Sequence, residues 1–228
     1  MEELFKNYDI FLTEKQLEKF EKYKKILLFW NEKFNLTAIK EDNEIVLKHF
    51  VDSVKYFNIY DVDKKIIDVG SGAGFPSIPI KIIREDLDIT MVESTLKKCN
   101  FLKECIKELD LKGIRVVNAR CEDLAKEESY REKFDYGTAR AVARLNTLCE
   151  YVLPFVKING KFVSYKGKDA KEELEEAKNA INVLGGEYLK TLTFNLQDAE
   201  RNIIIINKVK NTDKKYPRGK GKERSKPL

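Results

Sequence analysis

A glycine-rich turn at residues 68–76 restricts the possible folds of this chain more than any other segment. It reads DVGSGAGFP, follows the apolar run KIIDVG at 65–70, and is followed directly by a helical pattern at 77–84. Glycines between a strand and a helix permit a tight turn, and they let a ligand approach the backbone and the amides at the helix start. The segment therefore predicts a strand–turn–helix unit that binds a nucleotide-type ligand.

The spacing of the glycines separates the cofactors that could use such a turn. A dinucleotide fingerprint needs G-x-G-x-x-G, but its last position is Phe75, and the chain has no G-x-x-x-x-G-K-[ST] run. Asp68 precedes Gly70 by two positions, where a carboxylate suits a cationic ligand better than a pyrophosphate. S-adenosylmethionine carries a sulfonium and an ammonium, so it is favoured over NAD, although Asp68 could equally accept hydrogen bonds from loop amides. The loop residues expected to hold this cofactor are Asp68, Gly70, Ser71, Gly72, Gly74 and Phe75.

Apolar runs and helical patterns alternate after residue 64, which predicts an α/β fold with a parallel sheet and helices on both faces. The expected strands are 65–70, 88–93, 114–118, 134–139, 160–166, 188–194 and 202–208. The expected helices between them are 77–84, 95–109, 122–128, 145–157 and 169–184. No helix separates the last two strands, so they should form an antiparallel hairpin at one edge of a seven-stranded, mostly parallel sheet.

Two amphipathic patterns at 14–34 and 42–57 predict an N-terminal helical layer, with Thr13 placed to cap the first helix. The expected organisation is a helical cap at 1–60, a Rossmann-like domain at 61–209 and a basic tail at 210–228. Residues 207–228 carry seven Lys and two Arg against Asp213 and Glu223, a net charge of +7, while the whole chain has +5. Such a segment is either a solvated tail or a contact for phosphates.

The ends of the second and third strands supply further candidate ligands for the cofactor. Glu93 follows Gly70 by 23 residues, a position from which a carboxylate reaches the ribose of an adenosine, and Ser94 lies beside it. Cys121 and Glu122 follow the third strand, where a backbone amide and a carboxylate could recognise adenine. Glu122 could instead be an acidic residue that stabilises a helix start.

Cysteine and histidine usage indicates the compartment and argues against a metal. The four cysteines form no C-x-x-C pair and the chain has a single histidine, so no metal site is expected. Free thiols fit a reducing compartment, and the sequence shows neither a secretory signal nor an apolar run of bilayer length. A cytoplasmic protein without membrane association is expected.

Motifs along nearly the whole chain carry a family resemblance. They are FWNEKFNLTAI (29–39), HFVDSV (49–54), DVGSGAGFPSIPIKI (68–82), VESTLKKCNFL (92–102), TARAVARLNTLCEYVLP (138–154), YKG (165–167), ERNIIIINK (200–208) and KYPRGKGKERSKPL (215–228). In this order they closely resemble the bacterial glucose-inhibited division protein B family. The chain departs from the family at Ser77, where glycine is usual, and at Cys121, where alanine is common.

The resemblance implies a class I S-adenosylmethionine-dependent methyltransferase that modifies N7 of a guanosine in 16S ribosomal RNA. In this family the cofactor is bound by positions matching Gly70, Phe75, Cys121, Glu122 and Arg140. Guanine N7 has a lone pair and no proton, so direct displacement needs neither a general base nor a covalent intermediate, and no catalytic side chain is expected. A methyltransferase of another substrate, or a non-catalytic RNA-binding module on the same scaffold, are the alternatives.

The expected partner is small-subunit ribosomal RNA or the ribosomal subunit, bound by a monomer. The expected RNA contacts are Arg140, Arg144, Lys166, Arg201, Lys214, Lys215, Arg218, Lys220, Lys222 and Arg224. Polar residues in the N-terminal layer have two interpretations, a buried hydrogen-bond network that joins the cap to the sheet or direct contact with guanine. The network is favoured for these residues, which are Asn35, His49, Asp52 and Ser53.

Overall fold

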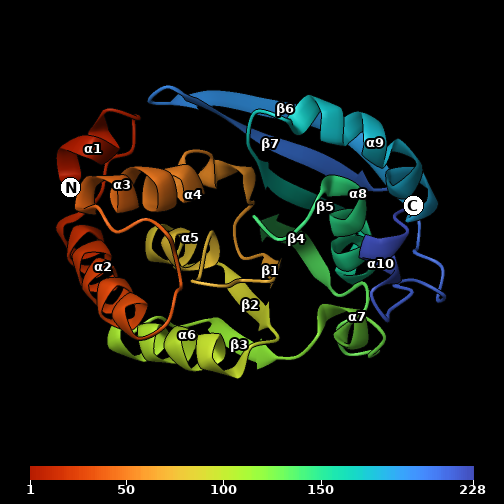
Figure 1. Cartoon of the computed structure of the whole chain (residues 1–228), viewed down its shortest axis with the longest axis horizontal. Helices are drawn as coiled ribbons and strands as arrows, with labels where there is room; N and C mark the ends of the chain where they lie inside the picture. The colour runs from red at the N-terminus through yellow and green to blue at the C-terminus, as the bar shows by residue number, and fades with distance from the viewer.

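The computed structural model describes residues 1–228 and contains one seven-stranded sheet with the order β3-β2-β1-β4-β5-β7-β6 (Figure 1). The strands are β1 (Lys65–Val69), β2 (Asp88–Glu93), β3 (Ile114–Asn118), β4 (Phe134–Arg140), β5 (Val156–Lys166), β6 (Gly186–Leu196) and β7 (Ala199–Lys208). Strands β1 to β5 run parallel to one another, whereas β7 runs antiparallel to both β5 and β6. The predicted α/β sheet, including its antiparallel edge hairpin, is confirmed.

The helices that connect the strands cover both faces of the sheet (Figure 1). They are α5 (Ser77–Ile83), α6 (Leu96–Glu108), α7 (Cys121–Leu124), α8 (Leu145–Val152) and α9 (Ala170–Val183). The prediction of a helix over 145–157 was wrong at its C-terminal end, because a 3-10 turn, η3 (Leu153–Phe155), follows α8 and β5 begins at Val156. Pro154 lacks the amide hydrogen that a continuing helix needs, and Val156 pairs with Phe134 of β4.

The N-terminal layer consists of six short or medium helical segments. They are α1 (Glu2–Lys6), α2 (Glu14–Lys33), α3 (Asp42–Ile45), the π-helical η1 (Val46–Val51), α4 (Asp52–Val54) and the 3-10 turn η2 (Phe57–Ile59). Thr13 caps α2 as predicted, since its hydroxyl accepts from the Gln16 amide while the Gln16 side chain accepts from the Thr13 amide. The sequence patterns missed α1 and the π-helical turn.

One hydrophobic core joins this N-terminal layer to the glycine loop. Phe50 packs against Phe20 and Tyr23, with ring centroids 5.2 and 5.3 Å apart, and Tyr23 packs against Phe75 of the loop at 5.7 Å. The same buried cluster continues into β1 and α5 through Ile66 and Ile78. The N-terminal layer therefore packs directly against the glycine loop.

The C-terminal segment 209–228, expected as either a solvated tail or a contact for phosphates, packs in part against the sheet domain. Thr212, Tyr216 and Glu223 are buried. The Arg131 guanidinium donates to the carbonyls of Thr212, Asp213 and Tyr216. A short helix, α10 (Lys222–Ser225), lies against α8 (Figure 1). None of the helices is long and apolar enough to cross a membrane.

Candidate functional site

The glycine loop turns sharply at the C-terminal end of β1. Gly70, Gly72 and Gly74 have φ values of +74°, +56° and +90°, the left-handed region that glycine adopts without strain. The amides of Gly70 and Ser71 donate to the Val92 carbonyl, and the Gly74 amide donates to the Ser71 carbonyl. These three amides are therefore bonded within the protein, which leaves fewer free donors in the loop for a pyrophosphate.

Asp68 lies buried beneath this loop. Its Oδ2 accepts a hydrogen bond of 2.8 Å from Ser77 Oγ, whereas its Oδ1 has no partner. Burial raises the pKa of Asp68 to about 7. Ser77, one of the two departures from the family pattern, thus supplies the donor for this carboxyl. The other interpretation was that Asp68 accepts hydrogen bonds from loop amides, but its side chain accepts none from them.

Glu93 connects the loop to the end of β2. Its Oε2 accepts from the Gly72 amide at 3.1 Å and its Oε1 accepts from the Thr95 amide at 2.8 Å. These two bonds fix the orientation of a carboxylate that is only 7% exposed. Each carboxylate oxygen can accept a second hydrogen bond, so Glu93 keeps capacity for two ligand donors.

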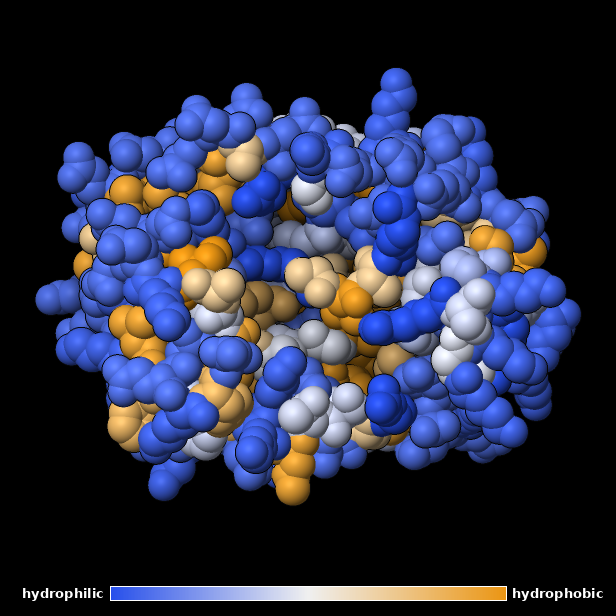
Figure 2. Space-filling model, in the orientation of Figure 1, coloured by the Kyte–Doolittle hydropathy of each residue, from blue (hydrophilic) through white to orange (hydrophobic).

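A cavity of about 800 Å³ opens between the ends of β1, β2, β3 and β4, and we call it the loop cavity. Its size falls within the range of cofactor sites. Among the residues predicted to bind the cofactor, those that line it are Gly70, Glu93, Ser94, Cys121 and Glu122. Figure 2 shows the hollowed centre of this face, with strongly hydrophilic side chains along its rim on the side of α8 and α10. Sequence reasoning missed Thr95, Lys98, Arg120, Asp123, Val142 and Tyr151 as lining residues.

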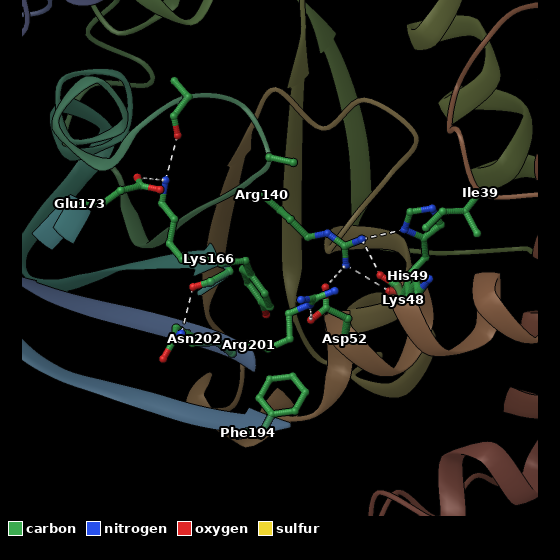
Figure 3. A pocket seen from close by; sticks show the side chains of 15 residues that line it. Ile39, Lys48, His49, Asp52, Arg140, Lys166, Glu173, Phe194, Arg201 and Asn202 are labelled. Atoms are coloured by element: carbon green, nitrogen blue, oxygen red, sulfur yellow. Dashed lines mark hydrogen bonds and ion pairs between the residues drawn. The ribbon is translucent and has the colours of Figure 1, made fainter. Parts of the chain in front are cut away.

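A second cavity of about 380 Å³ lies beside the loop cavity, and we call it the arginine cavity. Arg140, at the end of β4, reaches across it to the N-terminal layer (Figure 3). Its guanidinium forms an ion pair with Asp52 Oδ2 at 2.9 Å and donates to His49 Nδ1 at 2.7 Å and to Ser53 Oγ at 3.0 Å. Arg140 was predicted among the cofactor ligands, but it lines this second cavity and is absent from the lining of the loop cavity.

The protonation state of His49 follows from its two partners. Arginine can only donate, so His49 Nδ1 must accept and the proton lies on Nε2, which donates to Thr37 Oγ1 at 2.7 Å. Burial and the adjacent Arg140 charge lower the pKa of His49 to about 3, so the ring is neutral. It stacks on Phe75 with ring centroids 4.4 Å apart.

The predicted buried network therefore exists, with one correction. His49, Asp52 and Ser53 take part, but Asn35 is exposed. The buried asparagine is Asn31, whose side chain bonds the Leu36 amide and both backbone groups of Thr37. The sequence pattern could not distinguish Asn31, on the buried face of α2, from Asn35, in the turn that follows α2. His49 and Asp52 also line the arginine cavity, so contact with a ligand remains sterically open.

The wall of the arginine cavity opposite the N-terminal layer comes from β5, β7 and α9 (Figure 3). Lys166 is paired with Glu173 at 2.6 Å and donates to the Ala143 carbonyl, and burial lowers its pKa. Arg201 approaches Asp52 at 3.5 Å. Glu173, Asn202 and Phe194 of β6 also line this wall, and Lys48 lines the cavity from the N-terminal layer. None of these four residues was predicted.

The other predicted RNA contacts lie outside the arginine cavity. Arg144 is paired with Glu172 and Glu176 of α9, and Arg218 is paired with the buried Glu150. Lys214, Lys215 and Lys222 are exposed, with Lys215 near Asp213. Lys220 and Arg224 line the loop cavity instead. No group of three or more His, Cys, Asp and Glu side chains is arranged to hold a metal ion.

Comparison with known sequences decides the family. The model of the family GidB, rRNA small subunit methyltransferase G, matches residues 16–204. The chain belongs to the GidB family. A ribosomal RNA small subunit methyltransferase G of Lactococcus lactis subsp. cremoris is 46% identical over 226 residues, covering 97% of this chain and 95% of that protein. The protein of the same name from Acetivibrio thermocellus is 47% identical over 97% of this chain and 92% of its own length.

Solved structures show that this GidB-family chain has the class I methyltransferase fold. TYW2 of Pyrococcus horikoshii, solved in complex with MeSAdo, superposes with a TM-score of 0.56 at 15% identity, covering 70% of this chain and 62% of that chain. The YcgJ protein of Bacillus subtilis superposes with a TM-score of 0.54 at 12% identity, covering 72% of this chain and 100% of its own. At such identities the likeness establishes the fold alone.

Proposed function

We propose that this GidB-family methyltransferase transfers a methyl group from S-adenosylmethionine to N7 of a guanosine in 16S ribosomal RNA. The observation that carries the proposal is the junction of the loop cavity and the arginine cavity at Ala141, which lines both. A group transfer needs its donor and acceptor side by side in fixed orientation. Ala141 has a φ of +56°, uncommon for a residue with a side chain, and such outliers gather at functional sites.

The residues of the loop cavity fit S-adenosylmethionine. Glu93, held by two amides, has free acceptor capacity for ribose hydroxyls, and the buried Asp68 has an oxygen without a partner beneath the loop. The residues proposed to hold the cofactor are Asp68, Gly70, Ser71, Gly72, Gly74, Phe75, Glu93, Ser94, Cys121, Glu122 and Arg140. Six of these residues lie outside the lining of the loop cavity, namely Asp68, Ser71, Gly72, Gly74, Phe75 and Arg140. Arg140 would act through Phe75, whose ring centre lies 5.2 Å from its guanidinium carbon. When bound, the cofactor supplies an electrophilic methyl group on a sulfonium.

The arginine cavity is proposed to hold the target guanine. Guanine N1 and N2 are hydrogen-bond donors and O6 is an acceptor, and this cavity offers both carboxylates and cations. Asp52 and Glu173 would accept from the base, while Arg201 would donate to it. Because N7 carries no proton, the chain need only align the base and exclude water, which a neutral His49 permits.

The remaining basic residues are proposed to contact the RNA around the target base. A base inside folded RNA must be unpaired or extruded before N7 is accessible. Arg144, Lys166, Arg201 and the basic C-terminal residues Lys214, Lys215, Arg218, Lys220, Lys222 and Arg224 form this set. We propose that the protein acts as a monomer in the cytoplasm, with the N-terminal helices as a cap on the methyltransferase domain.

Methyl transfer from labelled S-adenosylmethionine to small ribosomal subunits lacking the modification tests the function. Nucleoside analysis should recover the label as 7-methylguanosine. A Gly72→Val variant is the control, because a branched side chain at a φ of +56° would distort the loop beside Glu93. Label in another nucleoside, or in protein, would reject the substrate. Cofactor binding without transfer to any RNA would favour the non-catalytic module.

A further inference from the structure

Two basic residues of the C-terminal segment belong to the wall of the loop cavity. Lys220, Gly221 and Arg224 line it together with Cys121 and Glu122. The Lys220 and Arg224 side chains make no ion pair, and the only hydrogen bond of Arg224 is a long one of 3.4 Å to the Val142 carbonyl. Two cations in this segment are thus left available at a cavity rather than neutralised by carboxylates.

Buried carboxylates on either side fix this part of the wall. Glu150 of α8 accepts three hydrogen bonds from the Arg218 guanidinium, from Nε to Oε1 at 2.9 Å, from Nε to Oε2 at 3.1 Å and from Nη2 to Oε2 at 2.7 Å. It also accepts from the Arg218 amide at 2.8 Å. Glu223 is fully buried, accepts from the Gly219 amide, and its carbonyl accepts from Thr147 Oγ1 at 2.9 Å. The segment between these anchors is therefore held against α8.

The backbone between the anchors is unusual. Gly219, Lys220 and Gly221 have consecutive φ values of +74°, +58° and +73°. Glycine adopts this region freely, but a lysine rarely does, and such a conformation persists only where the surrounding structure imposes it. The contacts at the two anchors therefore impose this backbone conformation, and with it the position of Lys220.

We propose that Lys220 and Arg224 bind the adenine nucleoside end of the cofactor, which makes the C-terminal segment a wall of the cofactor site. This inference rests on the proposed use of S-adenosylmethionine. The methionine end of that cofactor carries an ammonium and a sulfonium, which repel cations, and a carboxylate, which attracts them, so the placement rests on position. Lys220 and Arg224 line the cavity together with Cys121 and Glu122, and a guanidinium can stack on a neutral adenine there. Helix α8 contacts both α7, which begins at Cys121, and α10, so the two basic residues lie on the side of the cavity where adenine is expected.

Calorimetric titration with S-adenosylmethionine and with 5′-methylthioadenosine, in the absence of RNA, tests the proposal. The variant is Lys220→Ala with Arg224→Ala, and the matched control is Lys210→Ala with Lys226→Ala. The control removes the same charge from exposed positions of the same segment that do not line the cavity. We expect Kd to rise about tenfold for both ligands in the first variant and less than twofold in the control. Unchanged circular dichroism and thermal unfolding would show that both variants fold.

Each alternative outcome has a separate meaning. If the unsubstituted protein binds neither ligand, the proposed cofactor and this inference both fail. If it binds both and the two variants match it, the inference alone is overturned. A rise in Kd for S-adenosylmethionine but not for methylthioadenosine would place the residues at the methionine end. If both Kd values stay unchanged and a separate titration with small-subunit ribosomal RNA weakens in the first variant, this inference is overturned and the two residues belong to the RNA surface.

Discussion

Alanine at Gly74 should damage the contact between the glycine loop and the N-terminal layer. A Cβ at this position would lie 2.6 Å from Ile78 Cδ1 and 2.8 Å from the Tyr23 hydroxyl. Tyr23 is fully buried, and its hydroxyl donates to the Ala73 carbonyl. The added methyl group must therefore displace α5 or the side chain that ties α2 to the loop.

The expected loss of stability can be worked from these contacts. A left-handed backbone costs a residue with a Cβ roughly 1–2 kcal/mol, and an added methylene in a packed core costs about 1–3 kcal/mol. Gly74→Ala should therefore lose about 2–5 kcal/mol of unfolding free energy. Gly72→Ala is the matched control, because its φ is +56° and the nearest atom to its Cβ would be the Gly70 carbonyl oxygen at 3.7 Å. It should lose only the backbone contribution of about 1–2 kcal/mol.

Urea unfolding followed by circular dichroism measures both variants against the parent protein. The midpoint should fall further for Gly74→Ala than for Gly72→Ala with an unchanged slope. Thermal unfolding should agree, at roughly 2–4 °C for each kcal/mol in a chain of this size. Equal losses for the two variants would refute the steric reasoning, because both share the left-handed backbone and only one has close neighbours.

Three further results are expected. Burial raises the pKa of Asp68 to about 7, so its contribution to the unfolding free energy is complete below about pH 4 and is lost as the pH rises through 7. The stability of Asp68→Asn relative to the parent should therefore be greater at pH 8 than at pH 5. A difference in urea midpoints that does not change with pH would contradict this. Arg218→Ala leaves the buried Glu150 unpaired and should cost about 3–5 kcal/mol in thermal unfolding, part of which Glu150→Gln in the same background should restore; no recovery would mean that the charge is not the cause. Cys121 is the only cysteine that is not buried, and it lines the loop cavity, so S-adenosylmethionine should slow its alkylation as followed by peptide mass spectrometry; labelling at an unchanged rate would argue against a cofactor in that cavity.

The sequence by itself determined the sheet and the position of the glycine loop. Apolar runs at strand spacing and helical periodicity are local properties, so the seven strands and the capping of α2 by Thr13 could be predicted. The glycine loop could also be predicted, because a turn of this kind requires glycine at positions fixed along the chain. Family motifs extended this knowledge to nearly the whole length.

The tertiary structure alone decided which distant side chains meet. Arg140 was predicted at the right strand end, but its partners His49 and Asp52 come from the N-terminal layer and place it in the arginine cavity. The basic residues of the C-terminal segment look equivalent in the sequence. Folding pairs Arg218 with the buried Glu150, leaves Lys214 exposed, and brings Lys220 to the loop cavity. The role of a basic side chain depends on the groups that it contacts in the fold. Those groups lie far away along the chain, so a local sequence pattern cannot predict them.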